Sequence, residues 1–536
     1  MKIVKKIWLV GLAVLLVSLM SFSPAMAVKE GGTLNLHINK TPDSLWPLTA
    51  TCRRATYLFE LTYNYLVGFN DANEIVPQLA ESWDVSDDGL TYTFHLRKGV
   101  KFHDGYPFTA KDVEFTYTLL ANKKAASLFF GKVEPVKGAK AYYDGEANKV
   151  DGIQVVDDYT IKFVLEKPNA AFLSNLMFPI VPEHIFGKIP VDQLATSPES
   201  QKLIGTGPFK LVKYVTDQYY EFECFDDYWQ GKPHIEKIYV KIAKADVAIA
   251  MLEKGEIDYI PEFPPSELDY VKSLPNLKIL TQTNTTWPWA WCFNLKRSYF
   301  KDKRVRQAIA YALDRQGFVD SVLRGYGTVV NFPNTNARWA WPDPSEINQY
   351  PYNPEKAKTL LKEAGWDPDR VIEILYYPGN KERDQFATIG QQMLKNVGIK
   401  ADVVCMDVAR AVEKFHKGNF DILQTGASAQ PDPDYQSLYF ESSKVIPAGD
   451  NITSYANKRV DELFKKGRKT FDPAERAKIY KEINKILNDE LPWIIICEPM
   501  HVSVVNKRVH GMHFNPNIIA FRDPARLLDI HKWWLE

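Results

Sequence analysis

"PQLAESWDVSDDGLTYTFHLRKGVKFHDGYPFTAKDVEFT", residues 77–116, is the stretch that decides the fold class. At its centre, Tyr92, Phe94 and Leu96 alternate with more polar residues, which is typical of a half-buried strand. Residues 109–120, TAKDVEFTYTLL, are typical of a helix, and Thr109 can cap its first turn. A strand and a helix this close together indicate a mixed α/β domain.

The same mixture continues along the chain. Residues 157–168, DDYTIKFVLEKP, repeat the alternation of a strand after an Asp-Asp turn. A later helix is expected from Asn353, its cap, to Gly365, which can end it, and another from its cap Asp472. We therefore expect α/β domains, two to four of them in 536 residues, and no helical bundle or pure sandwich.

The first 27 residues are typical of a secretory signal peptide. MKIVKK carries three lysines, an apolar run covers residues 7–20, and residues 25–27 form the small-x-small pattern of a cleavage site. An uncleaved anchor helix is the other interpretation, but the helix-breaking Pro24 favours cleavage after Ala27. No cysteine follows the apolar run before Cys52, so we expect an exported, periplasmic protein and not a lipoprotein.

Composition and motifs exclude several functions. Basic and acidic residues balance at 66 each, which gives no reason to expect a nucleic acid partner. No serine-hydrolase, zinc-protease or phosphate-loop motif is present, and His510 and His513 have no cysteine or acid beside them to complete a metal site. The sequence therefore indicates no enzyme, no catalytic residues, no metal and no cofactor. Five cysteines are far apart, and we expect most of them to be small buried hydrophobes.

Five stretches in order resemble one family. The sequence is similar to the family 5 extracellular solute-binding proteins of bacterial ABC importers, the group of dipeptide- and oligopeptide-binding proteins. The stretches that carry the resemblance are residues 77–116, IGTGPFKLVKY at 204–214, AIAMLEKGEIDYIP at 248–261, FKDKRVRQAIAYALDRQ at 300–316 and YNPEKAKTLLKEAGW at 352–366.

The resemblance implies an α/β fold of the periplasmic-binding-protein type (type II, cluster C). Two main lobes would close around a ligand cleft, and a third lobe would be inserted near the N-terminus. The implied divisions are a signal peptide at 1–27, lobe I at 28–70, 190–282 and 500–536, an inserted lobe II at 71–189, and lobe III at 283–499.

Tryptophans gather where the chain would cross into lobe III. In TNTTWPWAWCFNLKR, residues 283–297, Trp287, Trp289 and Trp291 are two residues apart and would share one face of an extended strand. We expect at least one of them to face a ligand, while the others pack between the lobes. By analogy, Trp46, Trp339 and Trp341 also border the cleft, with Arg53 and Arg54 as further polar contacts.

Peptide-binding relatives hold the peptide's ammonium with an aspartate in a G-W-x-x-D-x-x-D-P segment. When TGASAQPDPDYQS, residues 425–437, is aligned on Asp432, the anchor position falls on Ala429 and the tryptophan position on Gly426. The anchor charge is therefore absent there, unless Asp432 or Asp434 replaces it. Lys381 or Arg383 lies near the position where relatives hold the peptide carboxylate.

These features predict the substrate-binding component of an ABC importer, which delivers a small-molecule solute to an inner-membrane permease. We expect a monomer. The missing ammonium anchor and the tryptophans favour an oligosaccharide, whereas the family resemblance and the cations favour a peptide, and the two stay near parity. A secreted enzyme or a non-transport sensor on the same scaffold is the remaining alternative.

Overall fold

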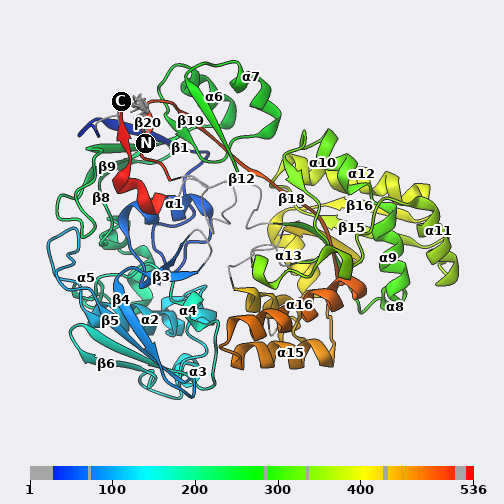
Figure 1. Ribbon diagram of the computed structural model, residues 1–536, viewed down its shortest axis with the longest axis horizontal. Coiled ribbons are helices and arrows are strands. Elements are labelled where there is room, and N and C mark those ends of the chain that lie inside the picture. The colour runs from blue at the N-terminus through cyan, green and yellow to red at the C-terminus, as the bar shows by residue number, and fades with distance from the viewer. Residues whose placement is uncertain are drawn as a thin grey trace, which may run out of the picture.

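The computed structural model describes residues 28–70, 74–282, 288–333, 337–426, 432–447, 449–513 and 527–536. The chain forms two halves (Figure 1). One half contains a seven-stranded sheet and, below it, a four-stranded sheet, and the other half contains a six-stranded sheet. We keep the names lobe I, inserted lobe and lobe III for these three parts, and we propose the lobe divisions given above.

Lobe I is built on a mixed sheet in which β1 pairs in parallel with β10 and β11 and the other pairs are antiparallel. Its strands, in spatial order, are β12 (Leu277–Gln282), β19 (His501–Asn506), β11 (Tyr259–Ile260), β1 (Thr33–Ile38), β10 (Lys237–Ile242), β9 (Tyr219–Cys224) and β8 (Phe209–Val215). The α-helices of this lobe are α1 (Arg53–Thr62), α6 (Ala245–Glu253) and α7 (Leu268–Lys272). A short ladder joins β20 (Val509–His510) to β21 (Trp534–Leu535).

The inserted lobe is an antiparallel sheet with helices packed on it. Its strands, in spatial order, are β4 (Ala80–Val85), β5 (Thr91–Leu96), β7 (Thr160–Val164) and β6 (Ile153–Asp157). Its helices are α2 (Ala110–Leu120), α3 (Ala139–Asp144), α4 (Phe172–Asn175) and α5 (Glu183–Phe186). The two-stranded ladder of β2 (Val67–Phe69) and β3 (Ile75–Pro77) lies where the chain enters it.

Lobe III is an α/β sheet covered on both faces. Its strands, in spatial order, are β14 (Gly327–Thr328), β18 (Trp493–Pro499), β13 (Trp289–Phe293), β17 (Ile422–Gly426), β15 (Val371–Tyr376) and β16 (Lys400–Cys405). Its helices are α8 (Ser298–Lys301), α9 (Lys303–Ala312), α10 (Arg315–Ser321), α11 (Pro354–Glu363), α12 (Lys381–Asn396), α13 (Val408–His416), α14 (Ser437–Phe440), α15 (Lys458–Lys469) and α16 (Pro473–Glu490).

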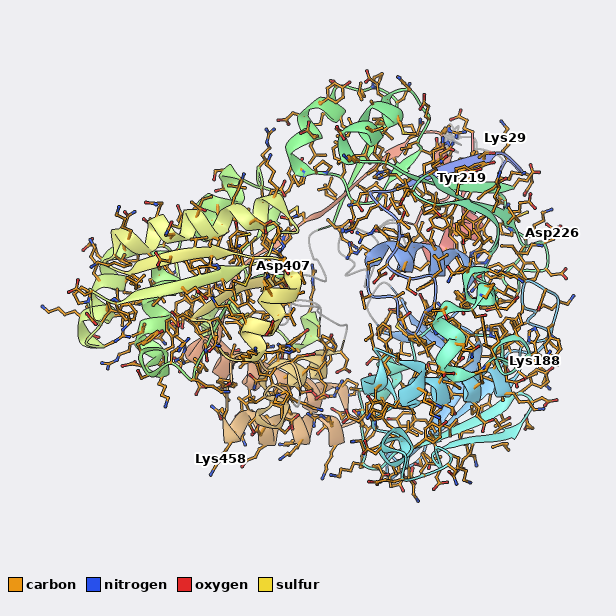
Figure 2. All side chains as sticks on the ribbon, turned by 180° about the vertical axis from the view of Figure 1, so that it is seen from behind. Lys29, Lys188, Tyr219, Asp226, Asp407 and Lys458 are labelled. Atoms are coloured by element: carbon orange, nitrogen blue, oxygen red, sulfur yellow. The ribbon has the colours of Figure 1, made fainter. Side chains whose placement is uncertain are left out.

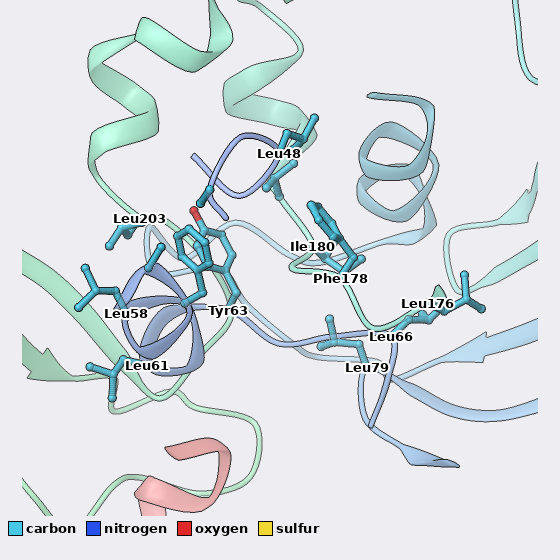
Figure 3. Close-up of a cluster of buried hydrophobic side chains, with 14 of the residues drawn as sticks. Leu48, Leu58, Leu61, Tyr63, Leu66, Leu79, Leu176, Phe178, Ile180 and Leu203 are labelled. Atoms are coloured by element: carbon cyan, nitrogen blue, oxygen red, sulfur yellow. The ribbon is translucent and has the colours of Figure 1, made fainter. Parts of the chain in front are cut away.

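The hydrophobic cores divide the protein into two bodies. One continuous core joins lobe I to the inserted lobe, and Figure 3 shows part of it, where Leu58 and Leu203 lie near Tyr63 and Leu79 and Phe178 continue the cluster. Lobe III has separate cores on the two faces of its sheet. Lobe I has a further core under α6 and α7, and Tyr326 of lobe III packs against it. Apart from this contact, the core clusters of the described residues keep lobe III separate from lobe I and the inserted lobe.

The chain passes between the two bodies at one end of the molecule. Strand β18 ends in the lobe III sheet at Pro499, and β19 begins in the lobe I sheet at His501, so the two run on as one extended segment (Figure 1). The other crossing leads from Gln282 in β12 to Trp289 in β13. We call these two crossings the hinge.

The expected local structures are confirmed where the sequence carries a cap. Thr109 and Asp112 form a reciprocal capping box at the start of α2. The side chain of Asn353 accepts the backbone N–H of Lys356 at 2.9 Å, and that of Asp472 accepts Glu475 N–H at 2.8 Å.

The cysteines fit their prediction only in part. All five are free thiols; Cys292 and Cys497 are buried in lobe III, but Cys405 at the end of β16 is exposed.

Candidate ligand site

The sheet of lobe III has a point where its connections diverge. From β15 the chain passes through α12 to β16 on one side, and from β16 it returns through α13 to β17 on the other side of β15. Phe386 of α12 packs in one core and Phe415 of α13 against the other, so these helices cover opposite faces. In open sheets with parallel strands, ligands bind at the carboxyl ends of the strands at such a point.

This carboxyl edge faces the other half of the molecule. Asp407 follows β16 and caps α13, and Figure 2 shows it on the side of lobe III that is turned toward lobe I. The carboxyl ends of β15 and β17 lie in the same edge, because these strands are parallel to each other and β16 is parallel to β15. The divergence point is therefore on the side of lobe III that is turned toward lobe I.

Arg383 lies beside this point, in the first turn of α12, and is only 5% exposed. Its guanidinium donates to the carbonyl of Tyr377 at 3.1 Å and to the carboxylate of Asp384 at 3.3 Å, and lies 5.3 Å from the centre of the Tyr377 ring. Within the part of the chain that the structure describes, its buried Nε–H meets no acceptor. Arg383 is thus a cation with an unused donor at the edge where a ligand is expected.

A chain of hydrogen bonds holds Arg383 from behind. The side chain of Gln424 in β17 donates to the backbone carbonyl of Arg383 at 2.7 Å, and its Oε1 accepts the indole N–H of Trp291 at 2.9 Å. The hydroxyls of Tyr377 and Thr425 meet at 2.6 Å across the ends of β15 and β17. Sequence reasoning missed these residues, although Gln424 inside the apolar strand DILQTG was a signal of a buried polar role.

The structure places two of the predicted tryptophans in the interior of lobe III. Trp291 has no exposed surface and Trp289 is 4% exposed, and both belong to the core under α10 and α12. They do share one face of β13, as predicted, but helices cover that face. Neither indole is open to solvent in this structure, so a contact of Trp289 or Trp291 with a ligand stays a prediction. Trp289 pairs with Gly426, the last residue of β17, and so lies next to the carboxyl edge.

The other predicted tryptophans come from other elements: Trp46 is in lobe I, and Trp339 and Trp341 are in the segment between β14 and α11. Trp46 has no exposed surface and packs edge-on against Phe186 at 4.7 Å, so its contact with a ligand also stays a prediction. Trp341 packs edge-on against Phe332 at 5.5 Å. Trp339 is 38% exposed, with Tyr480 edge-on to its ring and the guanidinium of Arg476 over the ring at 5.5 Å, so it is the most accessible of the predicted tryptophans among the described residues.

The charged residues predicted to contact a ligand differ in whether they form ion pairs in this structure. Lys381 is exposed at the start of α12, near Arg383. Both carboxylate oxygens of Asp432 accept from the guanidinium of Arg476 at 2.7 Å, and Asp434 accepts from Arg468 and from the Tyr480 hydroxyl. Since both aspartates are engaged in ion pairs with arginines of lobe III, neither is a ready partner for a ligand ammonium.

Arg53 lies at the hinge on the lobe I side. Its guanidinium reaches Glu262 at 3.2 Å and Nδ1 of His501 at 3.0 Å, while Nε2 of His501 bonds to the carbonyl of Pro261 at 2.8 Å. Desolvation, together with the charge of Arg53, lowers the pKa of His501 to about 4, so the ring is neutral at pH 7. Arg54 instead donates to Asn39 at 3.3 Å.

Three predictions cannot be placed. Trp287, Ala429 and the signal peptide at 1–27 lie outside the described residues. No described helix has the length and apolar character to cross a membrane.

Two bodies joined by a hinge, each with a mixed sheet, define a lobed α/β binding protein. Over residues 74–446, the sequence matches the bacterial extracellular solute-binding proteins, family 5. The match covers more than half of the chain, and this protein belongs to that family.

Proteins named as solute-binding proteins are similar to this chain over most of its length. The oligopeptide-binding protein AppA of Bacillus subtilis is 30% identical over 95% of this chain and 92% of its own length. Its structure in complex with a nonapeptide superposes with a TM-score of 0.79, covering 95% of this chain and 100% of that one, at 29% identity. A dipeptide-binding protein of Escherichia coli (30% identical; 85% and 86% covered) and heme-binding protein A of Haemophilus influenzae (31%; 85% and 84%) are also similar.

Proposed function

We propose that this protein captures a peptide in the space between its two bodies and delivers it to the inner-membrane permease of an ABC importer. It acts as a monomer by binding and closing, without chemistry. The observation that carries the choice of a peptide is Arg383, a buried cation with an unused N–H at the divergence point of the lobe III sheet. Such a group suits the carboxylate of a peptide. The relatives described as oligopeptide- and dipeptide-binding proteins support the same choice.

The argument for an oligosaccharide is weaker than the sequence indicated. It rested on the absence of an ammonium anchor at Ala429, which lies outside the described residues, and on a row of indole faces along the cleft. Trp46 and Trp291, however, are in the interior. Trp339 is 38% exposed, and a sugar ring or an aromatic side chain of a peptide would suit its accessible part equally. The oligosaccharide therefore remains an outcome to be tested and is no longer favoured.

Titration of the purified, ligand-free protein with peptides of two to nine residues, beside cello-, xylo-, manno- and chito-oligosaccharides, decides between the classes. We expect a peptide to bind in the micromolar range or tighter and to raise the unfolding free energy by about 2.7 kcal/mol at a hundredfold excess over Kd. Isothermal titration calorimetry and thermal unfolding measure the two effects. Binding of an oligosaccharide with no response to any peptide would overturn the proposal.

We propose further that residues 1–27 direct export and are removed, leaving Val28 as the first residue in the periplasm. N-terminal sequencing of the protein from its native host is expected to begin VKEGG. A chain that still begins with Met1, or that carries a lipid, would contradict this processing.

A further inference from the structure

Lobe III contacts the other body at the hinge and again at the opposite end of the molecule. At the hinge, Met500 N–H donates to the carbonyl of Tyr326 at 3.0 Å, and Arg324 pairs with Asp269 at 2.6 Å. At the opposite end, the corner between α15 and α16 lies against the inserted lobe beside α4 (Figure 1). Contacts so far from the hinge must separate when lobe III swings away.

Contacts of several kinds form this second junction. The backbone N–H of Ala170 in the inserted lobe donates to the carbonyl of Arg468 in α15 at 2.8 Å. The ring of Phe471 covers Gly89 so closely that a Cβ atom on Gly89 would lie 2.5 Å from it. Lys444 of lobe III also pairs with Glu134 of the inserted lobe at 3.6 Å.

The two sides of the hydrogen bond are held in place by their own lobes. On the inserted lobe, the Tyr92 hydroxyl donates to the carbonyl of Asn169 at 2.8 Å, and the Asn169 side chain accepts the N–H of Ala171 at 3.1 Å. On lobe III, the guanidinium of Arg468 is held by Asp434 at 3.0 Å and by Glu441. Neither partner has to be ordered when the bodies meet, so little conformational entropy opposes the contact.

The hydrogen bond also meets a need of α15. Arg468 is in the last turn of this helix, where carbonyl groups have no partner within the helix. The N–H of Ala170 supplies one from the other body. Gly89 has φ of +67°, a conformation that suits glycine, and its missing side chain leaves the space that Phe471 occupies.

We propose that this junction is a latch that holds the two bodies in the arrangement seen here. It consists of three contacts between the inserted lobe and lobe III: Gly89 with Phe471, Glu134 with Lys444, and Ala170 with Arg468. The inference rests on the proposed function, because a latch matters to a protein that retains a solute by closing. The latch acts on the separation of the two bodies and needs no contact with the solute. It favours the closed population and thereby slows solute release, so the affinity depends on a surface of the inserted lobe.

The test uses the ligand-free full-length mature chain, so it does not depend on knowing the solute. Hydrogen exchange at the Ala170 amide reports the latch directly, and small-angle scattering reports the separation of the bodies. In Phe471→Ala we expect the Ala170 amide to exchange at least about fivefold faster and the radius of gyration to increase. Tyr352→Ala is the matched control, because Tyr352 is a lobe III aromatic residue with 46% exposure against 44% for Phe471. It should change neither quantity.

Exchanging the charges of Lys444 and Glu134 provides a second, independent experiment if Phe471→Ala folds poorly. Lys444→Glu places two carboxylates together and should also speed exchange at Ala170, whereas the double variant Lys444→Glu with Glu134→Lys should restore slow exchange. Unchanged exchange and radius in both Phe471→Ala and Lys444→Glu would overturn the latch. That result would leave the proposed function intact, because peptide capture is contradicted only if the wild-type protein binds no peptide.

Discussion

Replacing Arg476 with alanine is expected to destabilise lobe III by about 3–5 kcal/mol, because it leaves a carboxylate desolvated without its partner. Arg476 is 7% exposed, and its guanidinium binds both oxygens of Asp432 at 2.7 Å. Its Nε–H also donates to the carbonyl of Gly467 at 3.1 Å, which ties α16 to α15. Urea unfolding of the mature protein at pH 7, followed by circular dichroism, measures the loss.

Two controls separate the buried pair from charge in general. The double variant Asp432→Ala with Arg476→Ala removes both charges, so it should be less destabilised than Arg476→Ala alone. Arg459 pairs with Glu482 at 2.8 Å on the surface, where it is about half exposed, and Arg459→Ala should cost no more than about 1 kcal/mol. A loss below about 1 kcal/mol for Arg476→Ala would contradict the structural role, and Asp432 would again be a candidate ammonium anchor.

The local structure was readable from the sequence because its causes are local. A cap such as Asn353 or Asp472 bonds to a backbone N–H three residues away, so the residue type and its spacing are sufficient. Alternation in residues 90–96 likewise predicted the strand β5, whose Tyr92, Phe94 and Leu96 are buried. The family resemblance extended these local predictions to a lobed fold.

The site was less predictable because its causes lie far apart in the chain. Trp289 and Trp291 share a face, as their spacing predicts, but whether helices cover that face depends on where β13 lies in the sheet. It lies between β17 and β18, away from both sheet edges, so both of its faces are packed. Similarly, nothing in PDPDY shows that Arg476, more than forty residues later, binds Asp432.

Replacing Arg383 with methionine is expected to weaken peptide binding by about 2–5 kcal/mol, because the ligand carboxylate would lose its buried partner. Methionine keeps much of the side-chain length and apolar contact but carries no charge. The informative comparison uses the tightest-binding peptide of the titration series and the same peptide with an amidated C-terminus. For the wild-type protein, calorimetry should show that amidation costs most of the same free energy, whereas for Arg383→Met amidation should make little further difference.

Trp291→Phe is the control for indirect damage at this site. It removes the indole N–H that bonds to Gln424, which in turn supports the carbonyl of Arg383. An unsatisfied buried amide should cost about 1–3 kcal/mol of stability, yet the preference for a free carboxylate should remain, since the guanidinium is still present. Equal sensitivity to amidation in the wild-type protein and in Arg383→Met would show that another group holds the carboxylate. Lys381, exposed two residues earlier at the start of α12, would then be the next cation to replace.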